Sequence, residues 1–339
     1  MKILVTGGVG FIGSHTVVEL YNSGYEPVIV DNLYNSNLDV LQGIKEITGK
    51  DFPFYNIDCN DADKLRVLFD KERFDGVIHF AAYKAVGESV ERPLNYYENN
   101  LISLMVLLRV MKEFDVKNFV FSSSCTVYGQ PEELPVTELT PRKPATSPYG
   151  NTKAIAEDII RDYVHSRPDI KAISLRYFNP IGAHESALIG ELPNGVPSNL
   201  VPFITQTAAG VRPSLTVFGD DYDTEDGTCI RDFIHVVDLA KAHVKALERL
   251  QEEEKNNYYD VFNVGTGEGY TVLKLINTFE QVNGVKLNYK IGPRREGDVE
   301  KIYAQADKVN NVMKWKAEKT MADALKDAWN WQLKITPEK

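Results

Sequence analysis

The feature that most constrains the fold is a regular alternation of short apolar runs with amphipathic stretches over the first half of the chain. Each run is almost continuously hydrophobic, which is typical of strands covered on both faces, as in a parallel sheet. The alternation with helix-like stretches predicts an α/β fold with a doubly wound parallel sheet. The predicted strands are KILVT (2–6), PVIVD (27–31), FPFYNID (52–58), DGVIHFAA (75–82), KNFVFSSS (117–124) and KAISLRY (171–177).

The local composition of the sequence changes after about residue 178, where proline, glycine and asparagine become frequent. Loop-rich regions of this kind often cover a binding site. We therefore predict a Rossmann-type domain over residues 1–178, to which later segments near 230–265 return. A smaller α/β substrate-binding domain is predicted over residues 179–339.

Composition excludes several classes of protein. The 48 acidic residues outnumber the 38 basic ones, and the net charge of −10 disfavours binding to nucleic acid or to anionic membranes. Cys59, Cys125 and Cys229 match no metal-site spacing and no disulfide framework, which suits a reducing cytosol. The start MKILVTGGVG does not resemble a signal peptide, and no apolar run approaches 18 residues. We expect a soluble cytoplasmic protein without a metal site.

A glycine-rich segment, KILVTGGVGFIGSH, follows the first predicted strand and opens a helix. Gly7, Gly10 and Gly13 let the backbone approach a pyrophosphate, which the amides at the helix N-terminus attract. The spacing is G-x-x-G-x-x-G and not the commoner G-x-G-x-x-G, so a plain strand–turn–helix is the alternative. The segment predicts a dinucleotide site if other residues support it.

Such support comes from the ends of the next strands. Asp31 ends the second, where a carboxylate accepts hydrogen bonds from an adenosine ribose and repels a 2′-phosphate. No arginine follows in DNLYNSN, so NAD is favoured over NADP, the alternative being that Asp31 only caps a turn. Asp58 and FAAYK (80–84) end the third and fourth strands, at the expected ligand edge. Lys84 would there meet a phosphate or remain a solvated surface lysine.

The segment SPYGNTKAIAED (147–158) places Tyr149 and Lys153 one helical turn apart. The spacing alone is weak, because Tyr270 and Lys274 repeat it, and we interpret that second pair as the start of a structural helix.

The surroundings of the first pair are more informative. Ser147 can cap the helix, and Pro148 suits its first position. Tyr149 then lies in the first turn, where the helix dipole favours negative charge, with Lys153 on the same face. Together with an oxidised nicotinamide, these groups are expected to lower the pKa of Tyr149 by roughly three units, about 4 kcal/mol. Tyr149 would then act as a base near neutral pH.

A serine completes the set. FSSSCTVYG ends the fifth predicted strand, and Ser122, Ser123 or Ser124 could present a hydroxyl beside Tyr149. Serine, tyrosine and lysine together form a proton relay on a substrate alcohol while a nicotinamide accepts its hydride. Each serine alone is explained by a turn, so only the combination with the glycine loop predicts this chemistry.

These motifs closely resemble those of the UDP-glucose 4-epimerase (UDP-galactose 4-epimerase) family, within the extended short-chain dehydrogenases/reductases. The resemblance covers essentially the whole chain, through VTGGVGFIGSHT, DNLYNS, AVGES, FSSSCTVYG, SPYGNTK, RYFNPIGAH, EDGTCIRDFIHVVDLAKAH and PRREGD to the tryptophan-rich final helix. It implies an isomerase of galactose metabolism that interconverts UDP-galactose and UDP-glucose. The reaction would pass through a 4-keto intermediate, with NAD tightly bound and not consumed.

The resemblance also implies a role for each matching residue. Tyr149 would remove the proton of the 4-hydroxyl group, Ser124 would hydrogen-bond the same oxygen, and Lys153 would bind the nicotinamide ribose and lower the pKa of the tyrosine. The implied NAD-binding residues are Gly7, Gly10, Phe11, Ile12, Gly13, Asp31, Asn32, Asn35, Ser36, Asp58, Cys59, Phe80, Ala81, Ala82, Lys84, Asn99, Ser122, Tyr149, Lys153, Tyr177 and Phe178. The implied substrate-binding residues are Ser124, Tyr149, Asn179, Asn199, Leu200, Phe218, Arg231, Arg295, Asp298 and Ile302.

A site that accepts both faces of one sugar cannot hold the sugar by many directional bonds, so the UDP end should supply the binding energy. Arg231 and Arg295 could clamp the diphosphate, although a surface salt bridge would explain either one alone. The resemblance assigns Asn179, Asn199 and Phe218 to the diphosphate or the uracil, and Asp298 to the ribose.

The sequence departs from the family pattern at two positions. Ala82 stands where relatives often carry glycine. Ile302, four residues after Asp298, lies where bulky aromatic residues accompany restriction to glucose and galactose and small residues accompany acceptance of N-acetylated sugars. Isoleucine is intermediate, so acceptance of N-acetylated sugars is left open.

Three other functions are alternatives to the epimerase. A 4,6-dehydratase of the same superfamily would carry an Asp-Glu pair after the active-site threonine, but Val127 and Tyr128 follow Thr126 here. A net dehydrogenase would need exchangeable NAD. A non-catalytic nucleotide sensor would typically have lost the tyrosine or the lysine. The resemblance also suggests a homodimer through the helices at Pro93–Phe114 and Ser147–His165.

Overall fold

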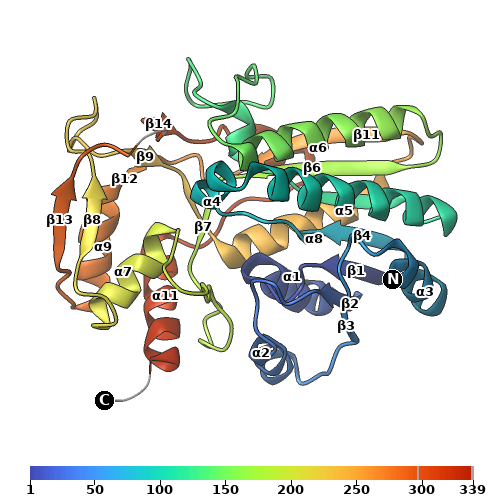
Figure 1. Cartoon of the computed structure of the whole chain (residues 1–339), viewed down its shortest axis with the longest axis horizontal. Coiled ribbons are helices and arrows are strands. Elements are labelled where there is room, and N and C mark those ends of the chain that lie inside the picture. The colour runs from blue at the N-terminus through green and yellow to red at the C-terminus, as the bar shows by residue number, and fades with distance from the viewer. Residues whose placement is uncertain (296–297, 337–339) are drawn as a thin grey trace.

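The computed structural model describes residues 1–295 and 298–336 of the chain. Its larger part is a seven-stranded parallel sheet between two layers of helices (Figure 1), with the order β11-β6-β5-β4-β1-β2-β3. The strands are β1 (Lys2–Thr6), β2 (Glu26–Asp31), β3 (Phe54–Asn56), β4 (Gly76–His79), β5 (Asn118–Ser122), β6 (Lys171–Tyr177) and β11 (Tyr258–Val264). The order reverses between β1 and β4, and ligands bind at the carboxyl ends of strands beside such a reversal.

Two hydrophobic cores cover the two faces of this sheet. One contains buried residues of α1, α2, α8 and α10, and the other contains residues of α3, α5 and α6. Figure 1 shows α5 and α6 along one face and α1 and α8 along the other. These helices are α1 (Phe11–Asn22), α2 (Asp39–Thr48), α3 (Ala62–Glu72), α5 (Pro93–Glu113), α6 (Pro148–His165), α8 (Val236–Glu252) and α10 (Asp307–Val312).

The predicted Rossmann-type sheet is confirmed, with two differences in detail. The third, fourth and fifth strands end at Asn56, His79 and Ser122, two or three residues before the predicted limits of 58, 82 and 124. The chain leaves the sheet at these points, and the polar groups that follow bond to other loops. The seventh strand, β11, pairs with β6 although about 80 residues separate them, so the last strand of the sheet comes from late in the chain.

A smaller region, at the left of Figure 1, begins after β6, continues after β11 and has its own core. It contains three short sheets, with the orders β10-β7, β12-β9-β14 and β13-β8. Its elements are β7 (Asn179–Ile181), α7 (Leu200–Ala208), β8 (Leu215–Phe218), β9 (Ile230–Arg231), β10 (Phe233–His235), β12 (Tyr270–Thr271), α9 (Val272–Asn283), β13 (Tyr289–Gly292), β14 (Lys301–Ile302) and α11 (Met321–Ile335). The remaining helices are α4 (Val86–Glu91) and the 3₁₀ helix η1 (Cys125–Tyr128).

Two negative findings apply to residues 1–295 and 298–336. None of the helices there is long and apolar enough to cross a membrane. The same residues contain no cluster of three or more His, Cys, Asp or Glu side chains that could hold a metal ion.

Candidate active site

A cavity of about 460 Å³ opens at the carboxyl ends of β1, β2, β4, β5 and β6, beside the reversal of strand order. The structure brings the predicted NAD-binding residues together here, from Gly7 through Tyr177. Phe178 lies elsewhere: it is buried in a separate cluster with Tyr128 and Ile302, because the chain turns away from the cavity after Tyr177. The binding of NAD by Phe178 therefore stays a prediction, since its side chain does not line the cavity.

The glycine loop between β1 and α1 forms one wall of the cavity. Gly7 has a φ of +69°, and a Cβ there would lie 2.9 Å from the amide nitrogen of Ala81. A Cβ on Gly13 would overlap the carbonyl oxygen of Gly7, so the absence of a side chain lets α1 pack against the loop. The helix begins at Phe11, after Gly10, and its first turn lines the cavity. This geometry suits a pyrophosphate at the helix N-terminus.

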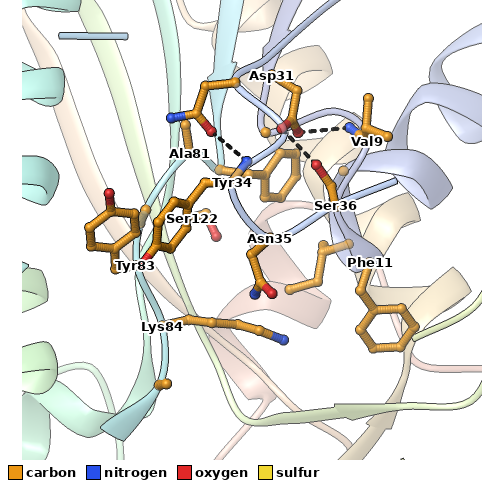
Figure 2. A pocket seen from close by; sticks show the side chains of 18 of the residues that line it. Val9, Phe11, Asp31, Tyr34, Asn35, Ser36, Ala81, Tyr83, Lys84 and Ser122 are labelled. Carbon is orange, nitrogen blue, oxygen red and sulfur yellow. Dashed lines mark hydrogen bonds between the residues drawn. The ribbon is translucent and has the colours of Figure 1, made fainter. Parts of the chain in front are cut away.

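Asp31 organises the neighbouring loop. Its carboxylate accepts hydrogen bonds from the amide of Val9 at 3.1 Å, the amide of Leu33 at 2.9 Å and the hydroxyl of Ser36 at 2.8 Å. Figure 2 shows this group above the cavity, with Asn35 below it. The turn-capping interpretation of Asp31 is thus correct, and since Asp31 also lines the cavity, it does not compete with the predicted contact to a ribose.

Lys84 extends into the cavity from the side opposite Asp31 (Figure 2). Its Nζ atom lies 3.1 Å from Oε1 of Glu191, and the same oxygen accepts a hydrogen bond of 2.6 Å from the side chain of Asn199. The carboxylate of Glu191 therefore contacts both Lys84, a predicted cofactor ligand, and Asn199, a predicted substrate ligand.

The predicted start of the Tyr149 helix is present. The Ser147 hydroxyl accepts a hydrogen bond of 3.1 Å from the amide of Gly150, and Pro148 occupies the first turn of α6. Tyr149 and Lys153 follow on one face, and both are buried and line the cavity. The ammonium of Lys153 lies 5.9 Å from the centre of the Tyr149 ring and donates a 2.7 Å hydrogen bond to the Ser122 carbonyl oxygen.

The structure distinguishes the three candidate serines. The Ser122 hydroxyl donates to the Tyr177 hydroxyl at 3.0 Å, and the Ser123 hydroxyl donates to Glu157 at 2.6 Å. The Ser124 hydroxyl accepts a hydrogen bond of 3.2 Å from the amide of Thr126, and its proximity to Tyr149 acts to lower the pKa of the phenol. Ser124 is therefore the serine next to Tyr149, and its contact with a substrate oxygen stays a prediction.

The expected lowering of the Tyr149 pKa is not what the folded chain produces. Burial raises the pKa of Tyr149 well above its usual range, and the neighbouring Tyr177 adds to this rise. Burial also lowers the pKa of Lys153 to about 7, against the opposing charge of Glu157. The predicted lowering includes the charge of an oxidised nicotinamide, so it stays a prediction for the NAD-bound protein; without that charge, the cost of removing the phenolate from water dominates.

The second Tyr-x-x-x-Lys pair is structural, as predicted. Tyr270 belongs to β12, and the side chain of Thr271 caps α9 by accepting a hydrogen bond from the amide of Lys274. Lys274 lies 4.9 Å from the centre of the Tyr270 ring, so the local pairing resembles the first pair. The two pairs therefore have the same spacing but different surroundings.

The predicted substrate-binding residues occupy the smaller region next to the cavity, apart from Tyr149 and Ser124. Arg231 on β9 lies 3.7 Å from Asp298 and pairs with Ile302 on β14, so these three residues are brought together. Phe218, at the end of β8, is exposed and pairs with Gly292, three residues before the exposed Arg295. Asn199 and Leu200 stand at the start of α7, and Asn179 at the start of β7.

Several cavity residues were missed by the sequence analysis. Tyr34 and Tyr83 line the cavity with ring centres 4.5 Å apart, and Tyr96 and Glu88 lie next to them and share a 2.8 Å hydrogen bond. Tyr34 and Tyr83 follow β2 and β4, so their position after a strand could have predicted that they line the cavity. Glu191 comes from a distant loop, and nothing in the sequence indicated that it lines the cavity.

Comparison with known proteins gives one consistent result. The family model described as GDP-mannose 4,6 dehydratase matches residues 4–328. The UDP-glucose 4-epimerase of Pasteurella multocida is 48% identical over 334 residues, covering 98% of both chains. That of Bacillus subtilis is 49% identical over 332 residues, covering 98% of this chain and 97% of the relative. Among solved structures, a Bifidobacterium longum UDP-glucose 4-epimerase in complex with NAD+ and UDP has a TM-score of 0.95 at 48% identity, with 99% of both chains covered.

Proposed function

The chain belongs to the UDP-glucose 4-epimerase family of the extended short-chain dehydrogenases/reductases, and we propose that it interconverts UDP-galactose and UDP-glucose with NAD as its cofactor. One observation carries this proposal: Tyr149 and Lys153 line the same cavity as the glycine loop and Asp31, and Ser124 is close enough to Tyr149 to act on the pKa of the phenol. A proton relay thus faces a dinucleotide site.

The residues of the cavity fit NAD. The first turn of α1 offers backbone amides to a pyrophosphate, and Asp31 offers a carboxylate to an adenosine ribose while it repels a 2′-phosphate. Lys153 is the residue for the nicotinamide ribose. NAD held by these residues would supply the acceptor and donor of a hydride for C4 of the sugar.

The chain's own groups then handle the proton. Tyr149 takes the proton of the 4-hydroxyl group, and Ser124 hydrogen-bonds the same oxygen. Burial opposes ionisation of the phenol, so the positive charge of Lys153 and that of the oxidised cofactor must offset the burial. The same burial keeps water from the keto sugar, which has to stay bound until the hydride returns.

The UDP end of the substrate is assigned to the smaller region. The proposed diphosphate ligands are Arg231 and Arg295. Further contacts to the diphosphate or the uracil are assigned to Asn179, Asn199, Leu200 and Phe218. The proposed ribose ligand is Asp298. In support, Arg231 is only partly buried and its partner Asp298 lies 3.7 Å away, a loose contact that a phosphate could replace.

A 4,6-dehydratase, the activity in the description of the matching family model, is disfavoured by the residues after Thr126. Val127 and Tyr128 are both buried, and the Tyr128 hydroxyl is engaged by Asn263 at 2.6 Å. These side chains offer no carboxylate pair for the elimination of water. Incubation with a nucleotide hexose should therefore yield no 4-keto-6-deoxy product.

The proposed function is tested by incubating the purified protein with UDP-galactose and no added NAD. Catalytic formation of UDP-glucose without accumulation of NADH is expected, because the hydride returns in each turnover. NADH that accumulates in proportion to added NAD would instead indicate a net dehydrogenase. No conversion by protein with bound NAD would refute the substrate assignment.

We also propose a cytoplasmic homodimer formed by α5 and α6. The surface next to this proposed interface exposes apolar side chains: Val90 on α4 and Leu94 and Ile102 on α5 are 62%, 71% and 42% exposed. Sedimentation that gives the mass of one chain of 38.2 kDa would refute the dimer.

A further inference from the structure

A buried carboxylate lies behind the catalytic set and has no part in the mechanism above. Glu157 stands on α6 one helical turn after Lys153 and is only 3% exposed. Its Oε1 accepts hydrogen bonds from the Ser123 hydroxyl at 2.6 Å and from Nε of Arg176 at 2.9 Å. Its Oε2 accepts a bond of 2.6 Å from Nη2 of Arg176. Both oxygens are therefore held in place.

The hydrogen bond to Ser123 connects Glu157 to the catalytic residues. Ser123 stands between Ser122, whose carbonyl oxygen accepts the 2.7 Å bond from Lys153, and Ser124, whose hydroxyl is a neighbour of Tyr149 and acts to lower its pKa. Glu157 thus anchors the segment that positions the lysine at one end and the substrate-facing hydroxyl at the other.

Glu157 and Lys153 are four residues apart, so they share a face of α6. Burial lowers the pKa of Lys153 to about 7, and the charge of Glu157 raises it. His79 on β4 also faces Lys153, but burial lowers its pKa to about 3, so it is neutral at physiological pH. Tyr149 is protonated in the folded chain for the same reason.

Other charged and titratable groups face Glu157 itself. Arg176 on β6 makes the paired bonds described above, and Nη1 of Arg142 lies 3.8 Å from Oε2. Tyr128 on η1 and Tyr259 on β11 are neutral, because burial raises the pKa of Tyr128 to about 12 and that of Tyr259 as well. Two guanidinium groups therefore share the carboxylate. The charge of Glu157 also acts on the buried Lys153 and raises its pKa.

A purely structural role would not explain this arrangement. A buried ion pair is often no more stabilising than apolar residues of the same volume. Here the carboxylate also binds the hydroxyl that adjoins both catalytic contacts, on the helix that carries Tyr149 and Lys153.

We propose that Glu157 is a positioning residue for the reaction: its negative charge keeps Lys153 in the ammonium form, and its hydrogen bond to Ser123 fixes the segment that holds Ser124. This role rests on the proposed epimerase function. Removal of the charge makes the neutral lysine more stable, so the activity that depends on the ammonium is lost at a lower pH.

The test compares Glu157→Gln with the wild type over pH 6 to 10, with kcat and KM for UDP-galactose normalised to bound NAD. In the variant, the loss of kcat at alkaline pH is expected to begin about one pH unit lower than in the wild type. At a given pH on this limb, kcat is then about tenfold lower. KM should stay within about twofold, since Glu157 does not touch the substrate. Asp162→Asn, the same charge change at an exposed position of α6, is the matched control and should follow the wild-type profile.

Two further variants keep the test decisive if Glu157→Gln does not fold. The double variant Glu157→Gln/Arg176→Met removes the whole ion pair and avoids an unpaired buried charge. Because loss of the Arg176 cation favours the ammonium of Lys153, it should shift the limb in the same direction by less than Glu157→Gln does. Glu157→Asp restores the charge and should return the alkaline limb toward its wild-type position. A folded variant without the Glu157 charge, but with the wild-type limb and kcat, would overturn the proposal. Inactivity of the wild type itself would instead overturn the proposed function.

Discussion

The contribution of Lys153 to catalysis can be worked out from its position. Lys153→Met removes a buried ammonium whose nitrogen lies 5.9 Å from the centre of the Tyr149 ring. At an effective dielectric constant of about 20, a unit charge at this distance is worth about 3 kcal/mol. This corresponds to roughly two pKa units of the phenol, and since the phenolate fraction falls in proportion below the pKa, kcat at pH 7 should fall about 100-fold.

The assay is UDP-glucose formation from UDP-galactose, normalised to the NAD released on denaturation, because Lys153 is also the proposed ribose ligand. Lys274→Met is the matched control: it removes a lysine 4.9 Å from the Tyr270 ring, in the pair with the same spacing outside the cavity, and should leave kcat unchanged. A normalised kcat of Lys153→Met within about threefold of the wild type would show that the lysine charge does not support ionisation of Tyr149.

Three further predictions follow from the same geometry. Tyr149→Phe removes the proton acceptor and should lower kcat by about 10²- to 10⁴-fold with NAD content unchanged; a loss below about tenfold would assign the base elsewhere. Gly13→Ala should yield protein with little bound NAD and a lower melting temperature, because the new Cβ would overlap the Gly7 carbonyl oxygen; wild-type NAD content would contradict this. Burial lowers the pKa of His15 and of His79 from 6.5 to about 3, so the unfolded chain binds protons that the folded chain does not. Their contribution to stability is complete above pH 6.5 and falls as the pH drops toward 3, by about 1.4 kcal/mol per pH unit for each histidine; urea midpoints that do not change between pH 7 and 5 would refute it.

Much of the fold and the NAD site could be predicted because the relevant signals are local. Apolar runs, the glycine loop and the Ser147–Pro148 helix start each act within about ten residues, and the structure has strands and helices where they indicate. Asp31 and Lys84 could be placed because each follows a strand, and the carboxyl ends of parallel strands meet at one edge. Local patterning therefore predicted part of the cavity lining, but not Glu191, which comes from a distant loop.

The tertiary structure decided how these residues interact. Three adjacent serines look alike in sequence, and only the neighbours Tyr177, Glu157 and Tyr149, 25 to 55 residues away, distinguish their roles. The pKa of Tyr149 depends on burial by the whole fold, which no local pattern contains, and this burial acts against the predicted lowering. Sequence alone determined which groups stand at the ligand edge. Long-range contacts and desolvation determined their protonation and their partners, because both depend on atoms brought together only when the chain has folded.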